Sequence, residues 1–385
     1  MSQGRAPLAA IAGVGTTRFG KLPGYSPDDL AGWALREALA DAALPVGAID
    51  GLVACRVSGY ESFSAAYGLQ PRWCVQLPAE GRMCGAAIEL ATAALAAGLC
   101  RTIALVYGND GRSAGATYGA GGTGYTAAGE GYGTRPELTR PYGMTSPGAF
   151  SALMFQRHRH EYGTTAEQLA QVALTFRRHA ALNPAAVLRD PLDLDTYLGS
   201  RYIVEPLHLF DYCLINDGGV AMILTVPEAA RDLPQPPVYV LGAAQRAQFL
   251  GSDFPPEDYW RGALREVGDA ALRQAGRERS EMDGLMSYDN FSPNVLFTLE
   301  GLGYCAPGES GPWIGDGGIG LGGQLPVNTS GGHLSESYLQ GWGLNVEAVR
   351  QLRGQCGERQ IPGAAHIQYA CAAPLVSSVV YGNQP

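Results

Sequence analysis

The chain has 385 residues, of which 46% are hydrophobic and only 16% charged, and it contains 53 glycines. This length and composition are typical of a globular α/β enzyme with one large core or two fused core-sized units, and they exclude a fibrous or disordered chain. The net charge of −9, together with the absence of an apolar run or leader that could enter a bilayer, leads us to expect a cytoplasmic protein with no nucleic-acid partner and no membrane association.

The chain begins with a predicted strand, helix and strand. Leu8–Val14 is an apolar run typical of a buried strand, and a glycine turn follows it. Ser26 followed by Pro27 indicates the start of a helix, which we expect to run to about Leu44. A short strand, Asp50–Ala54, comes next.

The middle of the first half contains one very apolar helix and a long insertion. Residues 84–99 are almost all Ala, Ile and Leu, which predicts a helix buried on every side, and it leads into the apolar strand 102–107. We expect an inserted loop or cap region at about 109–210. It starts with a stretch rich in Gly, Thr and Tyr and then contains two amphipathic segments, near 149–162 and 165–182.

The same order of elements returns later in the chain. A tight turn, Ile215–Gly219, and an apolar strand close the first half. Val238–Gly242 is then a predicted strand, a helix is expected at about Pro256–Gln274, and Asp283–Ser287 is another strand. Strand, helix and strand are therefore repeated.

An identical tetrapeptide supports this internal repeat. Ala34-Leu-Arg-Glu37 and Ala263-Leu-Arg-Glu266 lie in the first predicted helix of each unit. We therefore expect two related halves, residues 1–235 and 236–385. Because apolar strands alternate with helices, each sheet should be covered on both faces, with layers in the order helix, sheet, helix, sheet, helix.

The cysteines do not suggest a metal or disulfide framework. They occur at positions without a CxxC pair or regular spacing: Cys55, Cys74, Cys84, Cys100, Cys213, Cys305, Cys356 and Cys371. We expect most of them to be buried as small hydrophobic residues.

Short segments throughout the chain resemble the thiolase branch related to sterol carrier protein and lipid-transfer proteins. The first half contains Tyr142-Gly-Met-Thr-Ser-Pro-Gly, Glu161-Tyr-Gly-Thr-Thr-Ala-Glu-Gln-Leu-Ala, Asn183-Pro-Ala-Ala, Ser200-Arg, Glu205-Pro-Leu and Asn216-Asp-Gly-Gly. The second half contains Tyr288-Asp-Asn-Phe, Leu299-Glu-Gly-Leu-Gly, Gly322-Gly-Gln-Leu-Pro-Val-Asn-Thr-Ser-Gly-Gly and Arg350-Gln-Leu-Arg-Gly. The resemblance implies the α/β thiolase fold, in which duplicated βαβαβαββ halves form a five-layer αβαβα sandwich.

The residues that thiolases need for catalysis are replaced. Thiolases use a nucleophilic cysteine at a helix N-terminus, a histidine and a second cysteine. Counting back from the predicted end of the helix, the nucleophile position falls on Gly81 or Arg82, and Cys84 is the alternative nucleophile. Tyr338 stands at the histidine position, and Cys371 matches the second cysteine without its usual glycine cluster.

A second tyrosine completes a different pattern. The sterol-carrier branch has His-Asp-Cys-Phe where this chain has Tyr288-Asp-Asn-Phe. With Tyr338, this pattern is similar to that of thiolase-like aldolases that shorten steroid side chains, in which the matching tyrosines are the acid/base residues. The resemblance implies retro-aldol cleavage of a β-hydroxyacyl-CoA, expected to be a steroid side-chain thioester, to a ketone or aldehyde and a shorter acyl-CoA. This chemistry needs no redox cofactor, and either tyrosine can be the acid or the base.

Neighbouring residues are candidates for supporting roles. A developing enolate oxygen needs hydrogen-bond donors, which backbone amides in a glycine turn or at a helix start can supply. The candidate donors are the backbone amides of Gly331, Gly332 and the residues near Cys84, and the side chains of Asn328 and His333. Asp289 is expected to orient neighbouring backbone or ligand groups, and Asn290 is a further supporting candidate. The phosphates of CoA are expected near the insertion, where the candidate cations are Arg157, Arg159, Arg177 and Arg178.

Two other functions and a set of partners follow from the same resemblance. The chain could be a thiolase or acyltransferase that uses Cys84, or a non-catalytic carrier of acyl-CoA or lipid. Relatives of this type form homodimers and associate with a small zinc-ribbon/OB-fold subunit, which implies a heterotetramer. We expect zinc only in that partner subunit, with no cofactor or metal bound to this chain itself.

Overall fold

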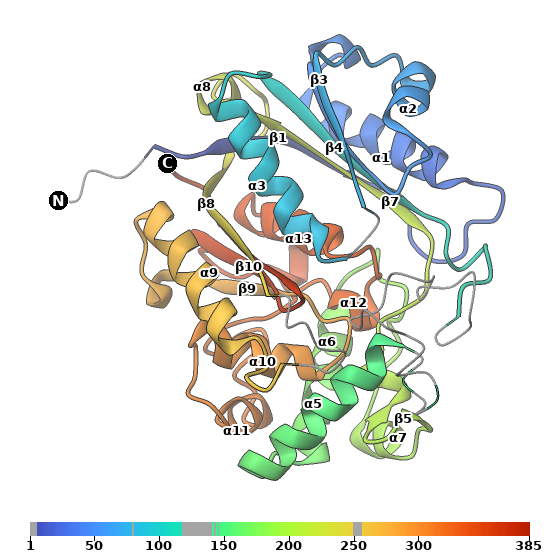
Figure 1. The fold of residues 1–385 in the computed structure, drawn as a ribbon, viewed down its shortest axis with the longest axis vertical. Helices are drawn as coiled ribbons and strands as arrows, with labels where there is room; N and C mark the ends of the chain where they lie inside the picture. Colours follow the sequence, from blue (N-terminus) through green and yellow to red (C-terminus); the bar gives the residue numbers. More distant parts are fainter. Residues whose placement is uncertain (1–5, 79–80, 118–140, 142–143, 145, 249–255) are drawn as a thin grey trace.

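The strands of the two halves pair into one mixed sheet. The computed structural model describes residues 6–78, 81–117, 141, 144, 146–248 and 256–385 (Figure 1). The first half contributes β1 (Ala9–Thr16), β2 (Gly51–Cys55), β3 (Trp73–Leu77), β4 (Thr102–Asn109) and β7 (Gly218–Thr225). The second half contributes β8 (Val238–Ala247), β9 (Gly284–Ser287), β10 (His366–Cys371) and β11 (Leu375–Gly382). Their order is β3-β2-β4-β7-β1-β8-β11-β10-β9.

The pairing of strands is the same in each half. In the first half β1 and β7 are antiparallel, β7 and β4 are antiparallel, and β4 and β2 are parallel. In the second half β8 and β11 are antiparallel, β11 and β10 are antiparallel, and β10 and β9 are parallel. The first strand of one half lies antiparallel to the first strand of the other, so β1 and β8 join the halves. This repeated topology agrees with the duplicated fold; the boundary at residue 235 stays a prediction.

The helices form three layers around the two parts of the sheet. On the first half, α1 (Pro27–Ala42) packs on β1, β4 and β7. On the second half, α9 (Arg261–Ala275) packs on β8 and β11, with α10 (Pro293–Leu302) beside it. Between them, α3 (Met83–Ala96) and α13 (Trp342–Leu352) contact strands of both halves (Figure 1). The order helix, sheet, helix, sheet, helix is thus the one expected.

Local sequence explains where α1 and α9 begin. Ser26 accepts a hydrogen bond from the Asp29 backbone, and the Asp29 carboxylate accepts one from the Ser26 backbone, which closes a capping box. The helix predicted from Pro256 begins only at Arg261. The Asp258 carboxylate accepts hydrogen bonds from the Trp260 and Gly262 backbones, so a turn occupies the residues before this helix.

The helix α3 is apolar throughout because it lies between the two parts of the sheet. It contacts β1, β4 and β7 on one side and β8, β10 and β11 on the other. The helix is therefore buried on both sheet-facing sides, but the prediction of burial on every side is wrong, because Ala93 and Ala96 are exposed. Across the described part of the chain, no helix combines the length and apolar character needed to cross a membrane.

The insertion covers the second half. It contains α5 (Pro147–Tyr162), α6 (Ala166–Ala181), α7 (Leu194–Leu198) and the hairpin β5 (Tyr202–Val204) and β6 (Leu207–His208), which confirms both predicted helices. Here α5 packs on α10, and α6 packs on α11 (Ser310–Gly315) and α12 (Gly332–Ser335). The other α-helices among the described residues are α2 (Tyr60–Tyr67) and α8 (Pro227–Ala230). Residues 118–140 of the glycine-rich stretch, and part of the segment that starts at Tyr142, lie outside the described residues.

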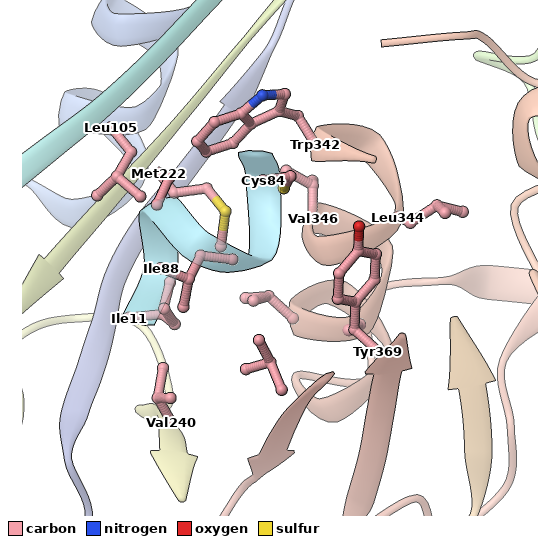
Figure 2. Close-up of a cluster of buried hydrophobic side chains, with 14 of the residues drawn as sticks. Ile11, Cys84, Ile88, Leu105, Met222, Val240, Trp342, Leu344, Val346 and Tyr369 are labelled. Atoms are coloured by element: carbon pink, nitrogen blue, oxygen red, sulfur yellow. The ribbon is translucent and has the colours of Figure 1, made fainter. Parts of the chain in front are cut away.

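The main core holds the middle layer against both halves. Figure 2 shows Cys84 and Ile88 of α3 packed against Trp342 and Val346 of α13 and Tyr369 of β10. Further members of this cluster come from β1, β4 and β7 on one side and β8 on the other. Full burial of each large apolar side chain contributes roughly 1.5–3 kcal/mol, so this cluster fixes the two halves relative to each other.

Candidate active site

The two predicted tyrosines meet in the structure. Tyr288 follows β9, and its backbone N–H donates to the Ala370 carbonyl of β10 at 2.9 Å. Tyr338 lies between α12 and α13. Their hydroxyl oxygens are 2.9 Å apart, and the side chains are only 3% and 8% exposed. Residues 50 positions apart in the sequence therefore share one hydrogen bond, in which one phenol donates and the other accepts.

Gly81 leaves room for the Tyr288 hydroxyl. A Cβ atom at Gly81 would lie 1.7 Å from Tyr288 Oη and 2.7 Å from Cζ, so any side chain at this position would collide with the phenol. This is one of the two positions to which the sequence count assigned the thiolase nucleophile. The space that a cysteine side chain would need is therefore occupied by the hydroxyl of Tyr288.

Cys84 has the surroundings of a packed thiol. It is fully buried in the first turn of α3, and its Sγ accepts a hydrogen bond from Asn345 Nδ2 at 3.1 Å. Burial raises the pKa of the Cys84 thiol well above its usual value, and the nearby Cys55 and Cys371 raise it further. Because a nucleophilic cysteine must ionise, these surroundings oppose that role.

The carboxylate of Asp289 anchors the segment that carries Tyr338. It accepts hydrogen bonds from the His333 backbone at 3.0 and 2.9 Å and from the Leu334 backbone at 3.3 Å. Burial raises the pKa of Asp289 to about 7, and the backbone hydrogen bonds oppose this rise. The residue after Tyr288 thus holds the chain just before Tyr338.

His333 is an uncharged ring packed between the two tyrosines. Its Nε2 accepts the Gly341 N–H at 3.1 Å, which assigns the ring proton to Nδ1. This Nδ1 lies 3.3 Å from Asp289 Oδ1, although without the alignment of a hydrogen bond. Burial lowers the pKa of His333 to about 3. The ring meets those of Tyr288 and Tyr338 edge-on, with centroids 4.8 and 5.1 Å away.

The glycine turn uses its own amides. Gly331 N–H donates to the Asn328 carbonyl at 2.9 Å, and Gly332 N–H donates to Ser330 Oγ at 3.4 Å. Gly332 has φ +61°, and a Cβ there would lie 2.3 Å from Asp289 Oδ2. The conformation and the close carboxylate both require glycine at this position. The turn therefore lets the chain approach Asp289, and these two amides are engaged within it.

The two predicted asparagines also make structural hydrogen bonds. Asn328 Nδ2 donates to the Ser287 carbonyl and its Oδ1 accepts the Ser287 N–H, both at 2.8 Å. Asn290 Oδ1 accepts a hydrogen bond from Asn294 in α10. Asn328 thus fixes the end of β9, next to Tyr288.

Two of the arginines expected near CoA have other partners. Arg177 is buried, and it donates to Ser335 Oγ at 3.0 Å and to the Asp190 carbonyl at 3.1 Å. Arg157 pairs with Glu161 at 2.6 Å. Both arginines hold elements of the insertion in place.

One residue at this site was not predicted from the sequence. Asn216 Oδ1 accepts the backbone N–H of Tyr338 at 2.6 Å, and Asn216 is fully buried. The available signal was the Asn216-Asp-Gly-Gly segment, which the sequence identified only as a tight turn.

Comparisons with known proteins extend over nearly the whole chain. Residues 255–378 match the thiolase C-terminal domain-like family. A steroid side-chain-cleaving aldolase of Thermomonospora curvata is 36% identical over 356 residues, covering 90% of each chain. A 17-hydroxy-3-oxo-4-pregnene-20-carboxyl-CoA lyase of Mycobacterium tuberculosis is 33% identical over 367 residues, covering 93% of this chain and 95% of the lyase. The solved structure of the Ltp2-ChsH2(DUF35) aldolase has a TM-score of 0.88 at 32% identity and covers 98% of both chains.

Proposed function

This chain belongs to the thiolase superfamily, on the branch of the steroid side-chain-cleaving aldolases, and we propose that it cleaves a β-hydroxyacyl-CoA by a retro-aldol reaction. The products are a ketone or aldehyde and a shorter acyl-CoA, which makes the protein a carbon–carbon lyase. We propose a steroid side-chain CoA thioester as the substrate, because the M. tuberculosis lyase is named for one. The 2.9 Å contact between Tyr288 Oη and Tyr338 Oη carries the assignment of the site.

Two phenols in contact can perform both proton transfers of this reaction. One tyrosine, as phenolate, takes the proton of the β-hydroxyl group. The Cα–Cβ bond then breaks, the hydroxyl carbon becomes the carbonyl of the ketone or aldehyde, and the bonding electrons form the thioester enolate. The other tyrosine protonates Cα. After turnover the phenolate has become a phenol and the other phenol has become a phenolate. Transfer of one proton along the 2.9 Å hydrogen bond between the two tyrosines restores the starting state.

The enolate oxygen requires donors that are not already used. The Gly331 and Gly332 amides bond within their own turn, so we propose the first-turn amides of α3 instead. This helix starts next to Gly81, where an added Cβ would lie 1.7 Å from Tyr288 Oη. The positive end of the helix dipole favours an oxyanion at that place.

Two observations favour the lyase over a thiolase that uses Cys84. A side chain at Gly81 would collide with the Tyr288 phenol, and burial raises the pKa of Cys84 well above its usual value. A thiolase needs a thiolate that can reach the acyl group, whereas the lyase needs only the two phenols.

The partners follow from the matched aldolase, whose name includes a DUF35 component. We propose a homodimer that binds a small zinc-ribbon/OB-fold subunit in that place, to give a heterotetramer with zinc in the small subunit only. Among the described residues, β3 pairs on one side only, with β2, and its Trp73, Val75 and Leu77 are half-buried. An unpaired edge of this kind suits pairing with a second copy.

We also propose that the enzyme works in the cytoplasm and binds no cofactor of its own. All eight cysteines are free in the structure, although five of them lie in or beside the same core. Free thiols are typical of a reducing compartment. The CoA thioester is the substrate rather than a resident group, and the retro-aldol step transfers no electrons to an acceptor.

The experiment that tests this function is product analysis with two substrate types. The full chain, alone and co-expressed with a DUF35-type subunit, is mixed with 17-hydroxy-3-oxo-4-pregnene-20-carboxyl-CoA and separately with a β-ketoacyl-CoA plus CoA. We expect a steroid ketone and a shorter acyl-CoA from the hydroxy substrate only. A CoA-dependent split of the keto substrate would instead identify a thiolase, and binding of both substrates without turnover would identify a carrier.

Replacement of either tyrosine by phenylalanine should have the largest effect on the rate. Tyr288→Phe and Tyr338→Phe each remove one proton-transfer group while keeping the ring, so we expect kcat to fall by about 100- to 10,000-fold. Thermal unfolding should change little, because the rings still pack. If both variants cleave the hydroxy substrate at nearly the wild-type rate, the assignment of the two tyrosines is wrong.

A further inference from the structure

We propose that Asn216 is a positioning residue for Tyr338. Both reacting phenols belong to the second half of the chain, and through Asn216 the first half sets the rate of their reaction. The inference rests on the role proposed for Tyr338. Neither proton-transfer group lies in the first half, but Asn216 of that half is hydrogen-bonded directly to the backbone of Tyr338.

The side chain of Asn216 is fixed at every polar atom. Its Oδ1 accepts the Tyr338 N–H at 2.6 Å, and its Nδ2 donates to the Asp217 carbonyl at 3.1 Å. Its backbone carbonyl accepts a hydrogen bond from Asn109 Nδ2 at 3.0 Å, at the end of β4. Asn109 and Asn216 are both fully buried. The acceptor that faces Tyr338 therefore cannot turn away without leaving buried polar groups unpaired, which costs about 1–3 kcal/mol for each.

The next residue ties the same turn to two loops of the first half. The Asp217 carboxylate accepts hydrogen bonds from the backbones of Leu22 at 2.6 Å, Arg112 at 2.8 Å and Ser113 at 3.0 Å. Asp217 is also fully buried. The turn that holds Tyr338 is thus clamped between the loop after β1 and the loop after β4.

The two glycines of the segment allow close approach on both sides. A Cβ at Gly218 would lie 3.3 Å from Leu339 Cδ2, so the start of β7 packs against the residue after Tyr338. A Cβ at Gly219 would lie 2.1 Å from the Leu30 carbonyl oxygen, so β7 also lies directly against α1. All four residues of Asn216-Asp-Gly-Gly therefore serve one arrangement, which connects α1, β4 and β7 to the Tyr338 segment.

Within its own half, the Tyr338 side chain contacts Tyr288 and His333, and further hydrogen bonds hold the segment on either side of it. Gly341 N–H donates to His333 Nε2 at 3.1 Å, and Ser330 Oγ donates to Glu336 Oε2 at 2.7 Å. These bonds close the segment at both ends, whereas Asn216 bonds to the backbone of Tyr338 itself. The backbone of Tyr288 is hydrogen-bonded to β10. The distance between the two hydroxyl groups therefore depends on where the bond to Asn216 places the backbone of Tyr338.

The direct test is the turnover of Asn216 variants. Displacement of a catalytic group by about 1 Å can lower a rate by roughly 100-fold, so we expect Asn216→Ala to lower kcat by about 10- to 100-fold. KM should stay within about threefold, because substrate binding is retained. Asn216→Asp keeps an oxygen facing the Tyr338 N–H but loses the bond to the Asp217 carbonyl, so it should keep a larger share of kcat than Asn216→Ala. Asn216→Ser, whose oxygen lies further from that N–H, should fall between them.

A matched control separates positioning from loss of stability. Thr17 is buried, and its Oγ1 accepts the N–H of Gly219 at 2.9 Å, on β7, three residues after Asn216. Thr17→Val removes this acceptor at nearly constant volume. We expect it to lower the unfolding temperature about as much as Asn216→Ala while leaving kcat unchanged. Equal rate losses in the two variants would overturn the inference.

A double variant shows whether Asn216 acts through Tyr338. In a Tyr338→Phe background the phenol is already missing, so Asn216→Ala should lower the residual rate no further. A full additional loss, or wild-type kcat in the single Asn216→Ala variant, would overturn the inference. If Asn216→Ala does not fold, the order of rates for Asp, Ser and the wild type decides the same question. If Tyr338→Phe alone keeps nearly the full rate, the proposed function fails before this inference is reached.

Discussion

By the sequence resemblance, the turn before α3 and the segment that carries Tyr338 match two catalytic positions of thiolases, and the two regions are built in opposite ways. In the turn, residues 81–84, the sequence count places the nucleophile at Gly81 or Arg82, and Gly81 has no side chain. A Cβ at Gly81 would lie 1.7 Å from Tyr288 Oη, so this space is filled by the side chain of Tyr288, which follows β9. In the segment, residues 328–341, the matching position holds the large polar side chain of Tyr338. The His333 backbone donates to Asp289, and the Asn328 side chain accepts a hydrogen bond from the Ser287 backbone.

The two regions therefore contribute to the site in different ways. The turn contributes space, because Gly81 has no side chain and Tyr288 Oη lies close to where a Cβ would stand. The segment had to keep its geometry, because Tyr338 must reach that hydroxyl at 2.9 Å. We therefore expect substitutions in the turn to act by blocking space, and substitutions around the segment to act by moving Tyr338.

Filling the emptied position should have the largest effect on this comparison. Gly81→Cys restores the residue type of a thiolase, but its side chain would displace the Tyr288 phenol. We expect kcat for the hydroxy substrate to fall by about 100-fold or more, since the two phenols no longer align. We also expect no thiolase activity, because Nε2 of His333, the histidine at this site, already accepts the Gly341 N–H. Product analysis with both substrate types measures the two activities together.

A matched cysteine tests whether the loss arises from the collision. An added Cβ at Gly47 meets no atom within 4 Å, so Gly47→Cys introduces the same thiol in open space and should leave the rate unchanged. If Gly81→Cys cleaves the hydroxy substrate at the wild-type rate, Tyr288 Oη does not need the space that Gly81 leaves. The proposed difference between the turn and the segment would then be wrong.

A change at Asp289 should have a smaller effect on rate and a specific effect on stability. Asp289→Asn removes one of the acceptors for the backbone of residues 333 and 334, so we expect about a tenfold loss of kcat. The pKa of Asp289 is raised to about 7 in the folded chain, above the unfolded value of about 3.9. Its stabilising contribution is therefore complete below about pH 3.9 and is lost as the pH rises through 7.

The pH dependence can be isolated by difference. His333 titrates in both proteins, so subtraction of the two unfolding free energies cancels its contribution. Between pH 5 and pH 8 the Asp289→Asn variant should gain stability relative to the wild type, by at most about 1.4 kcal/mol per pH unit up to pH 7. Urea unfolding at several pH values measures this gain. Parallel stability curves for the two proteins would contradict a buried carboxyl group with a raised pKa.

Much of the scaffold could be predicted from the sequence because its signals are local. The apolar run that became α3, the Ser26 cap of α1 and the strand before Tyr288 each follow from neighbouring residues. The fold class and the tyrosine pair came from the family resemblance. The start of α9 was wrong by five residues, since the turn made by Asp258 is not visible as a helix signal.

The contacts that complete the site could not be predicted in this way. Asn216 and Tyr338 are 122 residues apart, and no local pattern connects a turn before one strand with the backbone of a distant loop. The sequence also gave Asn328 as a side-chain donor without indicating that Ser287 already uses its amide. Residue type shows what a side chain can bond, whereas its partner is decided by packing.

The smallest expected effect is that of removing the thiol in the turn. Cys84→Ala deletes a fully buried Sγ and its hydrogen bond from Asn345, but Asn345 Nδ2 also donates to the Gly341 carbonyl at 2.9 Å. We expect a loss of about 1–2 kcal/mol in the free energy of unfolding and a kcat within about threefold of the wild type. Cys100→Ala, which removes another fully buried thiol beyond the far end of α3, is the control for stability. If Cys84→Ala abolishes turnover while Cys100→Ala does not, Cys84 is a nucleophile. The turn would then take part in catalysis through its thiol, and the role that the collision at Gly81 leads us to assign to Tyr288 would be wrong.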